Sequence, residues 1–327
     1  MTTALAMISG GLDSILAAKI VKDQGIEVIG ICFKSNFFGE ENALKIVKQI
    51  DIPLEVVDFS DEHFKMVKNP KHGYGKNMNP CIDCHAMMMR HCGELLERFH
   101  ADFIITGEVL NQRPMSQNRS ALDIVKNESG IGHKILRPLC AKNLNPTQME
   151  TEGLIDREAL MDIKGRNRKI QIELAEKLGI LEYPSPAGGC KLTEPNYSIR
   201  LEDLLEHKED ASKKDLELLK IGRHFRISKG AKIISTRTEE EGELLEQFLT
   251  QEDLMFLATD YNGSTVAVIG KATNEDIEFA AKISGRYCKG RYDKSVSISY
   301  GIYGENLNKT IDITPATDEV INNHILK

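Results

Sequence analysis

Residues 4–14 have the sequence Ala4-Leu-Ala-Met-Ile-Ser-Gly-Gly-Leu-Asp-Ser14 and predict a buried strand, a glycine-rich turn and the start of a helix. The backbone N–H groups of such a turn, together with the positive end of the helix dipole, bind anions such as phosphate. The turn offers two glycines for close approach, two hydroxyl donors and a carboxylate that could hold Mg²⁺, namely Gly10, Gly11, Ser9, Ser14 and Asp13. A strand-to-helix turn with an ordinary capping residue is the alternative interpretation.

Strand-like and helical segments alternate from this turn onward. The expected strands are 4–8, 26–33, 54–59 and 103–106, and the expected helices are 13–22, 41–50, 86–99 and 166–178. Such alternation predicts a parallel sheet with helices on both faces, in which ligands bind at the carboxyl ends of the strands. We therefore expect an α/β domain over residues 1–205, followed by a smaller α+β domain over residues 206–327.

The hexapeptide 9–14, placed after the first strand, resembles the signature of the PP-loop ATP pyrophosphatase superfamily. The lysine of the Walker loop is missing, so a P-loop NTPase is excluded. Members of the superfamily split ATP into pyrophosphate and an activated adenylate. The resemblance implies ATP and Mg²⁺ as cofactors, with Asp13 as a catalytic residue.

A second motif covers residues 104–117 and contains Thr106-Gly107-Glu108 and Gln112. It resembles a segment of the 4-thiouridine synthetases, and the resemblance implies that Gly107 and Gln112 help to bind the nucleotide. Asn111 stands where that family usually has glycine, and asparagine tolerates a positive φ better than most residues. The alternative for Glu108 is a surface ion pair with Arg113.

Seven cysteines on a chain without an export signal make a disulfide framework unlikely. Cys81 and Cys84 stand at an expected helix start, where the helix dipole favours the thiolate and lowers the thiol pKa. Cys190 ends a Pro-Gly loop, 183–190. Asn79-Pro80 with Cys84 and Cys190 resembles the catalytic pair of tRNA thiolation enzymes. Cys32, Cys92, Cys140 and Cys288 fit packing positions.

The extra cysteine, Cys81, departs from the two-cysteine pattern and resembles the iron-sulfur-dependent thiolases. That resemblance implies a 4Fe-4S cluster on Cys81, Cys84 and Cys190 with one open iron. A metal-free persulfide relay on Cys84 and Cys190 and a zinc site remain alternatives, although zinc needs a fourth ligand.

Basic residues gather twice in the second domain and are interleaved with tyrosines in the second cluster. This pattern favours phosphate contacts with base stacking, although a solvated face is the alternative. The candidate RNA contacts are Arg223, Arg226, Arg286 and Arg291. Residues 221–226 and 239–245 resemble the NFACT-type RNA-binding domain.

Composition limits the remaining choices. Hydrophobic residues make up 41% of the chain, the net charge is −7, and no apolar run reaches the length of a membrane span. We expect a cytoplasmic, ATP-dependent tRNA sulfurtransferase that adenylates a base carbonyl and takes sulfur from sulfide or a persulfide carrier. The alternatives are a PP-loop amidotransferase or ligase acting on a small molecule with zinc at the cysteines, and a noncatalytic RNA-binding protein.

Overall fold

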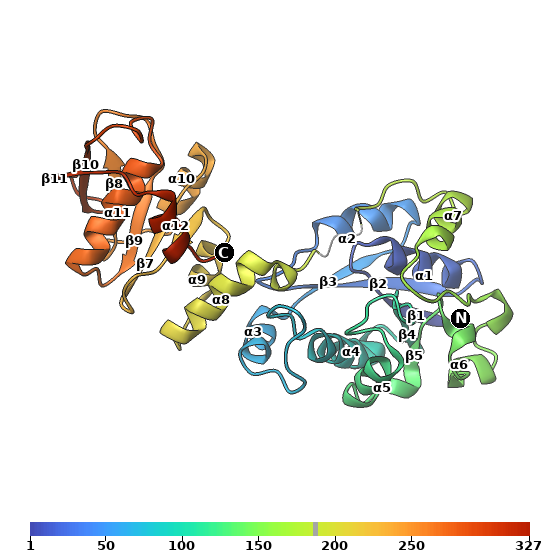
Figure 1. Cartoon of the computed structure of the whole chain (residues 1–327). Helices are drawn as coiled ribbons and strands as arrows, with labels where there is room; N and C mark the ends of the chain where they lie inside the picture. The colour runs from blue at the N-terminus through green and yellow to red at the C-terminus, as the bar shows by residue number, and fades with distance from the viewer. Residues whose placement is uncertain (186–188) are drawn as a thin grey trace. The chain divides into compact units, whose positions relative to one another are not determined.

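The computed structural model describes residues 1–185 and 189–327, which form two compact units, Met1–Thr193 and Glu194–Lys327 (Figure 1). Residues 186–188 of the expected Pro-Gly loop lie outside the described residues. No helix in the described ranges is long and apolar enough to cross a membrane.

Unit 1 is built on a five-stranded sheet with the order β3-β2-β1-β4-β5, in which every neighbouring pair is parallel. Its strands are β1 (Thr3–Met7), β2 (Glu27–Lys34), β3 (Leu54–Asp58), β4 (Phe103–Ile105) and β5 (Ile135–Leu136). Its α-helices are α1 (Leu12–Lys22), α2 (Glu41–Ile46), α3 (Ser60–Lys68), α4 (Cys81–Arg98), α5 (Arg119–Glu128), α6 (Gln148–Thr151) and α7 (Lys169–Lys177). Short 3₁₀ turns occupy Val47–Gln49, Gly132–Lys134, Ala141–Asn143, Arg157–Ala159 and Lys191–Thr193. The predicted parallel α/β fold is confirmed.

Successive side chains along each strand point to opposite faces of the sheet, and both faces are apolar. On β1, Ala4 and Ala6 belong to one buried cluster with residues of α1 and α7, whereas Leu5 belongs to another with residues of α4. Helices therefore cover both faces, as Figure 1 shows, because a strand buried on both sides must pack against something on each. The turns after β1 and β4 are left at the carboxyl edge of the sheet.

Two helices differ from their expected bounds. The helix expected over 41–50 ends at Ile46 and tightens into a 3₁₀ turn. The helix expected to begin at residue 86 begins at Cys81, directly after Pro80, so both cysteines lie in its first turn. Proline fits such a position because it has no N–H to leave unpaired.

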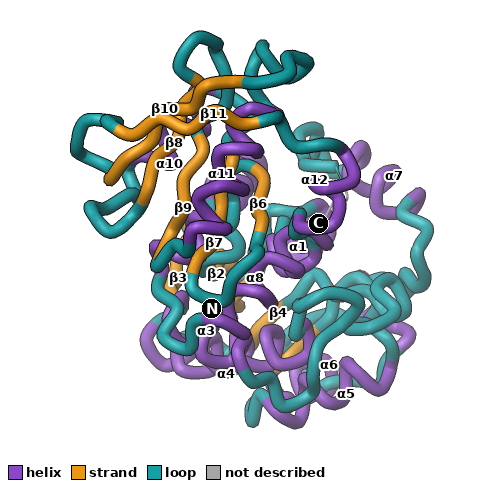
Figure 2. Tube along the Cα trace, turned by 60° about the vertical axis from the view of Figure 1, so that its left-hand side comes forward, coloured by secondary structure: helices purple, strands orange, loops and turns teal. Residues whose placement is uncertain are grey.

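Unit 2 contains an entirely antiparallel six-stranded sheet with the order β11-β10-β8-β9-β7-β6. Its strands are β6 (Arg223–Phe225), β7 (Ala231–Ser235), β8 (Leu254–Ala258), β9 (Val266–Gly270), β10 (Val296–Ile302) and β11 (Lys309–Ile313). Its helices are α8 (Pro195–His207), α9 (Lys213–Leu218), α10 (Glu239–Glu246), α11 (Asn274–Arg286) and α12 (Asp318–His324). Helix α11 runs across one face of the sheet (Figure 2) and buries Phe279 and Ile283 there. The expected smaller α+β domain is thus confirmed.

The boundary between the units differs from the expected position, residue 205/206, which falls inside α8. Arg200 of α8 donates to the carbonyls of Leu219 (2.9 Å) and Gly222 (3.1 Å) in unit 2. Asp203, also on α8, pairs with Arg226 and Lys232. These buried contacts attach α8 to the second sheet, and the helical period of residues 198–220 could not reveal them.

Candidate active site

The turn between β1 and α1 has the conformation expected of an anion-binding loop. Gly11 is the N-cap of α1, and no side chain caps the helix there. The hydroxyl of Ser14 donates to the Gly11 carbonyl at 2.8 Å, and the Ser9 hydroxyl donates to the Ser14 hydroxyl at 3.4 Å. The uncapped helix end therefore leaves its N–H groups available to an anion.

The two glycines of the turn serve different purposes. Gly10 has φ +78°, and a Cβ there would lie 2.6 Å from Asn42 Cβ and 2.7 Å from the backbone nitrogen of Ala43. A Cβ at Gly11 would meet only the Ser9 hydroxyl, at 3.6 Å. The packing of α2 thus requires Gly10, whereas the protein leaves space beside Gly11.

Asp13 lies in a polar cluster that joins α1 to a distant helix. Its Oδ2 accepts from Gln112 Nε2 at 2.7 Å and lies 3.7 Å from Arg168, while Gln112 accepts from Gln171 at 2.8 Å. Three buried atoms of this cluster have no partner: Asp13 Oδ1, Arg168 Nε and Gln171 Oε1. Unsatisfied buried polar atoms are costly. Their gathering here fits a site for a metal-bound polyphosphate.

Gly107 brings the second motif against this loop. A Cβ on Gly107 would lie 2.5 Å from the backbone nitrogen of Ser14, so only glycine allows the two segments to approach. Asn111 has φ +63°, which agrees with the expected left-handed backbone at that position. Its N–H donates to the Gln117 carbonyl at 2.7 Å.

Glu108 is buried and does not form the surface ion pair that was the alternative. It accepts from Arg137 Nε at 2.8 Å and contacts His85 Nδ1 at 2.9 Å, while Arg113 is exposed. Burial alone would raise the pKa of Glu108, but the Arg137 charge and the His85 hydrogen bond lower it to about 2. Glu108 is therefore a carboxylate that fixes His85, the residue after Cys84.

Cys81, Cys84 and Cys190 lie near one another. Burial raises the pKa of the Cys84 thiol, and the proximity of Cys190 and Cys81 raises it further. Burial likewise raises the pKa of Cys190 to about 12, with Cys81 adding to the shift. The expectation that the helix dipole lowers the thiol pKa is thus wrong for Cys84, because removal from water outweighs the dipole.

A single metal ion would need its ligand atoms around one point, and no group of three His, Cys, Asp or Glu side chains within 1–185 and 189–327 meets that condition. The cysteines of a cluster each bind a different iron. A 4Fe-4S cluster therefore requires neighbouring thiols rather than ligand atoms around a single point. The four other cysteines are buried packing residues, as expected.

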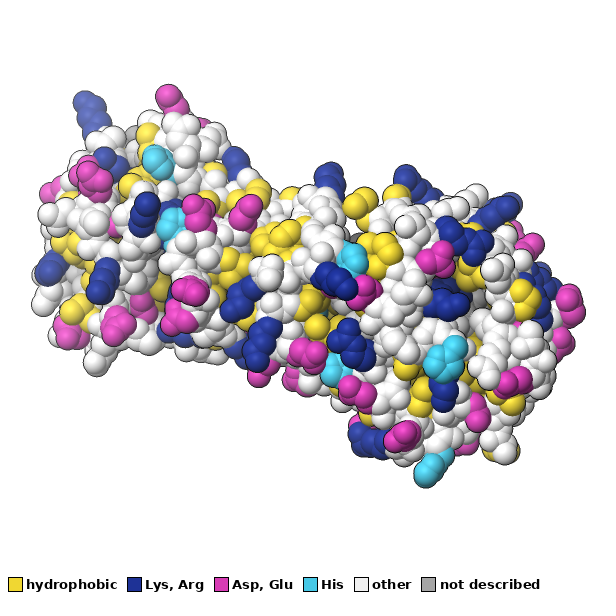
Figure 3. Space-filling model, turned by 90° about the horizontal axis from the view of Figure 1, so that it is seen from below, with side chains coloured by type: hydrophobic (Ala, Val, Ile, Leu, Met, Phe, Trp, Pro, Cys, Tyr) yellow, Lys and Arg dark blue, Asp and Glu magenta, His cyan; other side chains and the backbone are white. Residues whose placement is uncertain are grey.

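The four predicted RNA contacts separate into two pairs. Arg223 lies over the Tyr287 ring at 4.3 Å and Arg291 lies over the Tyr292 ring at 4.8 Å. These two arginines and the two tyrosines beneath them line one groove. Arg226 is bound to Asp203, and Arg286 pairs with Asp318 away from that groove. On the face that Figure 3 shows, Lys and Arg are interleaved with Asp and Glu, so charge alone does not outline an interface there.

Two kinds of functional residue escaped the sequence analysis. Arg168, the N-cap of α7, and Gln171 on α7 contribute to the Asp13 cluster, and no motif marks them. Their only signal is a polar pair at helical spacing, i and i+3. His85 follows Cys84 directly in the sequence, but its link to Arg137 through Glu108 depends on tertiary structure.

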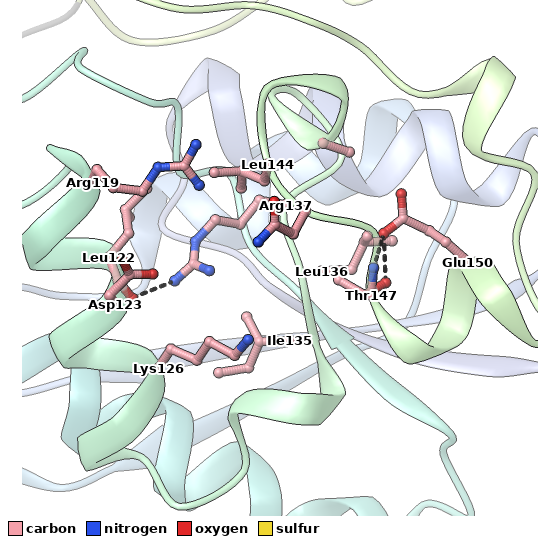
Figure 4. A pocket seen from close by; sticks show the side chains of 12 residues that line it. Arg119, Leu122, Asp123, Lys126, Ile135, Leu136, Arg137, Leu144, Thr147 and Glu150 are labelled. Carbon is pink, nitrogen blue, oxygen red and sulfur yellow. Dashed lines mark hydrogen bonds between the residues drawn. The ribbon is translucent and has the colours of Figure 1, made fainter.

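A further small pocket, of about 80 Å³, lies beside β5 and α5. Figure 4 shows Arg119, Lys126 and Arg137 around it, with Thr147 and Glu150 on the opposite side. None of the predicted site residues lines this pocket.

Two family models match separate parts of the chain, one within each unit. Residues 1–146 match the family model described as thiamine biosynthesis protein (ThiI), and residues 222–325 match the model described as NFACT protein RNA binding domain. The predicted resemblance to PP-loop enzymes of tRNA thiolation, with a C-terminal RNA-binding domain, is confirmed.

The chain is also similar to individual proteins. A tRNA-specific 2-thiouridylase of Caldicellulosiruptor saccharolyticus is 26% identical, over 85% of this chain and 86% of its own length. A tRNA-specific 2-thiouridylase of Clostridium botulinum is 33% identical, over 32% of this chain and 33% of its own length. A solved 4-thiouridine synthetase–RNA complex with bound ATP is 16% identical, with a TM-score of 0.35, over 54% of this chain and 50% of its own.

Proposed function

We propose that the protein is an ATP-dependent tRNA sulfurtransferase that acts on a uridine. One observation carries the proposal: Gly107 packs on Ser14 of the phosphate loop, and the adjoining Glu108 holds His85, next to Cys84. The same strand end therefore connects an anion-binding loop with a group of three cysteines. An enzyme that activates a base with ATP and then delivers sulfur needs both at one edge.

In the first step, the uridine carbonyl oxygen attacks the α-phosphorus of ATP, and pyrophosphate leaves. Ser9, Ser14 and the N–H groups of Gly10 and Gly11 would hold the phosphates. Asp13, through its unpartnered Oδ1, would hold Mg²⁺, which neutralises phosphate charge when bound. Gln112 orients the other Asp13 oxygen.

In the second step, a sulfur nucleophile attacks the activated carbon and AMP leaves with the former carbonyl oxygen. Cys81, Cys84 and Cys190 would hold a 4Fe-4S cluster, since three neighbouring thiols fit its ligand set; when bound, the cluster supplies an open iron for sulfide. The elevated pKa of Cys84 keeps that thiol protonated until a ligand or base takes its proton. Sulfide or a persulfide carrier is the proposed donor.

RNA would contact the second unit through Arg223 and Arg291. The match of residues 222–325 to an RNA-binding domain supports this part of the proposal. Arg226 and Arg286 are engaged in ion pairs, which makes them weaker candidates. The expected cytoplasmic location belongs to the same proposal.

The direct test combines nucleoside analysis with pyrophosphate release. Anaerobically purified protein, given unmodified tRNA, ATP, Mg²⁺ and sulfide, should produce thiouridine detectable by mass spectrometry. Asp13→Ala should abolish pyrophosphate release, whereas Asp23→Ala, at the exposed end of the same helix, should retain it. Equal release by wild type and Asp13→Ala would refute the assignment.

A further inference from the structure

Unit 2 contains a groove of about 1080 Å³ formed between α10 and the loops that follow β8 and α11. It is lined by three tyrosines, Tyr261, Tyr287 and Tyr292, and by four cations, Arg223, Arg237, Lys289 and Arg291. The Tyr292 side chain is 82% exposed and that of Tyr261 is 38% exposed. Aromatic rings in this number, beside cations and open to solvent, are typical of surfaces that bind unpaired nucleotides.

Two of the three rings of this groove, those of Tyr261 and Tyr287, are held in place by the surrounding chain. Tyr261 donates its hydroxyl to Asp293 at 2.6 Å, and a Cβ at Gly290 would lie 2.5 Å from the Tyr261 ring. Gly290 thus allows the ring to lie against the backbone of the 287–292 loop. Arg223 covers Tyr287 and also donates to the Thr236 carbonyl at 3.3 Å. Pre-ordered rings lose little entropy when a base stacks on them.

The opposite wall of the groove is acidic. Glu239, Glu243 and Glu246 of α10 line it, and their spacing places them along one side of the helix. Phosphates would be repelled from this wall and attracted to the tyrosine-bearing wall. Carboxylates can instead accept hydrogen bonds from the exocyclic amino group of a base, as they do from cytosine.

We infer that this groove binds an unpaired RNA segment whose bases carry amino groups. The phosphates lie along Lys289 and Arg291, the bases stack on Tyr261 and Tyr292, and their amino groups face the α10 glutamates. The inference rests on the proposed function, because it deepens the role of unit 2 in holding RNA. A duplex is a poor occupant, since its bases are already stacked on one another.

Fluorescence anisotropy with the full chain and labelled RNA tests this arrangement without ATP. Hexacytidylate should bind more tightly than hexauridylate, on the order of tenfold, because uracil has no amino group. Tyr292→Ala should weaken hexacytidylate binding on the order of tenfold, and Tyr292→Phe should restore it. Because Tyr292 is exposed, neither substitution threatens the fold.

Two further variants separate the acidic wall from general charge effects. Glu243→Gln should reduce the difference in affinity between hexacytidylate and hexauridylate. Lys271→Glu, a charge reversal at an exposed residue outside the groove lining, should leave hexacytidylate binding unchanged.

The inference is overturned if Tyr292→Ala binds hexacytidylate as wild type does, or if hexauridylate or an RNA duplex binds equally well. Binding of an acidic peptide at the same affinity would also overturn it. A chain that binds hexacytidylate through Tyr292 but thiolates no tRNA would refute the proposed function and leave the groove intact.

Discussion

At the residue scale, the cysteines fall into two groups, those that lie near other cysteines and those that pack in the core. Burial raises the pKa of both Cys84 and Cys190, and the proximity of Cys81 adds to both shifts, whereas Cys92 is fully buried in the core on α4. We expect anaerobic protein to be brown, with about four irons per chain. Alanine at any of the three clustered positions should remove iron and thiolation activity together, while Cys92→Ala should remove neither.

Iron analysis and nucleoside mass spectrometry on the four variants decide between the cysteine mechanisms. Iron-free protein that still thiolates tRNA, with activity surviving Cys81→Ala but lost in Cys84→Ala and Cys190→Ala, would contradict the cluster. The persulfide relay on two cysteines would then remain.

His63 is a second residue with an unusual setting, because its side chain is fully buried and both ring nitrogens lack a partner. It stacks on Phe59 at 4.8 Å, with Phe37 and Phe38 beside it. Burial lowers its pKa from 6.5 to about 4. Unfolded chains therefore take up a proton at a higher pH than folded ones, and stability declines as the pH falls from 6.5 to 4.

The size of this decline follows from the shift, at 1.36 kcal/mol per pKa unit, and is roughly 3 kcal/mol by pH 4. His63→Phe should remove this part of the pH dependence. Urea unfolding at pH 7 and pH 4.5 measures it: the loss of stability between the two values should be smaller in the variant. Identical losses in both proteins would show that His63 does not titrate on unfolding.

At the scale of elements, the contact between the end of β4 and α1 requires that residue 107 be a glycine, without a side chain. A methyl group on Gly107 would press on the Ser14 backbone, whereas one on Gly11 would meet only a hydroxyl at 3.6 Å. Gly107→Ala should therefore destabilise the protein by about 1–3 kcal/mol and weaken ATP binding. Gly11→Ala should keep the melting temperature and weaken ATP binding alone.

Thermal melts and ATP titrations of these two variants separate packing from phosphate contact. A Gly107→Ala protein with unchanged stability would mean that the strand end and the helix do not touch in solution. Full ATP affinity in Gly11→Ala would remove this turn from the nucleotide site.

Helix α8 gives a second prediction at this scale, concerning where the second unit begins. Asp203 is buried between Arg226 and Lys232, and a chain starting at residue 206 would leave both cations without it. Removing one partner of a buried ion pair costs about 3–5 kcal/mol. A fragment 194–327 should unfold cooperatively, whereas a fragment 206–327 should not. Cooperative melting of both by circular dichroism would contradict the assignment of α8 to unit 2.

These elements also show what the sequence could predict. The alternation of apolar runs and helical periods predicts the parallel sheet, and the Ser9–Ser14 turn predicts where its ligand edge lies. Neither pattern identifies which residues contact each other in the folded protein. The ion pair that occupies Arg226, the link between Glu108 and Arg137, and the approach of Arg168 to Asp13 join residues 23, 29 and 155 positions apart. Local periodicity and motif spacing carry no information at that range.

At the scale of the whole molecule, the proposed activity assigns the ATP site to one unit and the groove that holds RNA to the other. The two sets of residues share no side chain: Asp13 and its partners belong to Met1–Thr193, and the tyrosine-lined groove belongs to Glu194–Lys327. Contacts confined to separate compact units should add independently in binding free energy.

Single substitutions should consequently separate the two bindings. Arg291→Glu should weaken tRNA binding and flatten the dependence of log Kd on log salt, because each lost phosphate contact lowers the slope by about 1, and it should leave ATP affinity intact. Asp13→Ala should do the reverse, with tRNA affinity and salt slope both preserved. Filter binding from 50 to 200 mM salt measures the tRNA affinity and its salt slope, and equilibrium dialysis measures the ATP affinity. An Arg291→Glu protein with wild-type tRNA affinity and slope would assign RNA binding to another surface, whereas a joint loss of ATP and tRNA binding in either variant would mean that the two units act as one site.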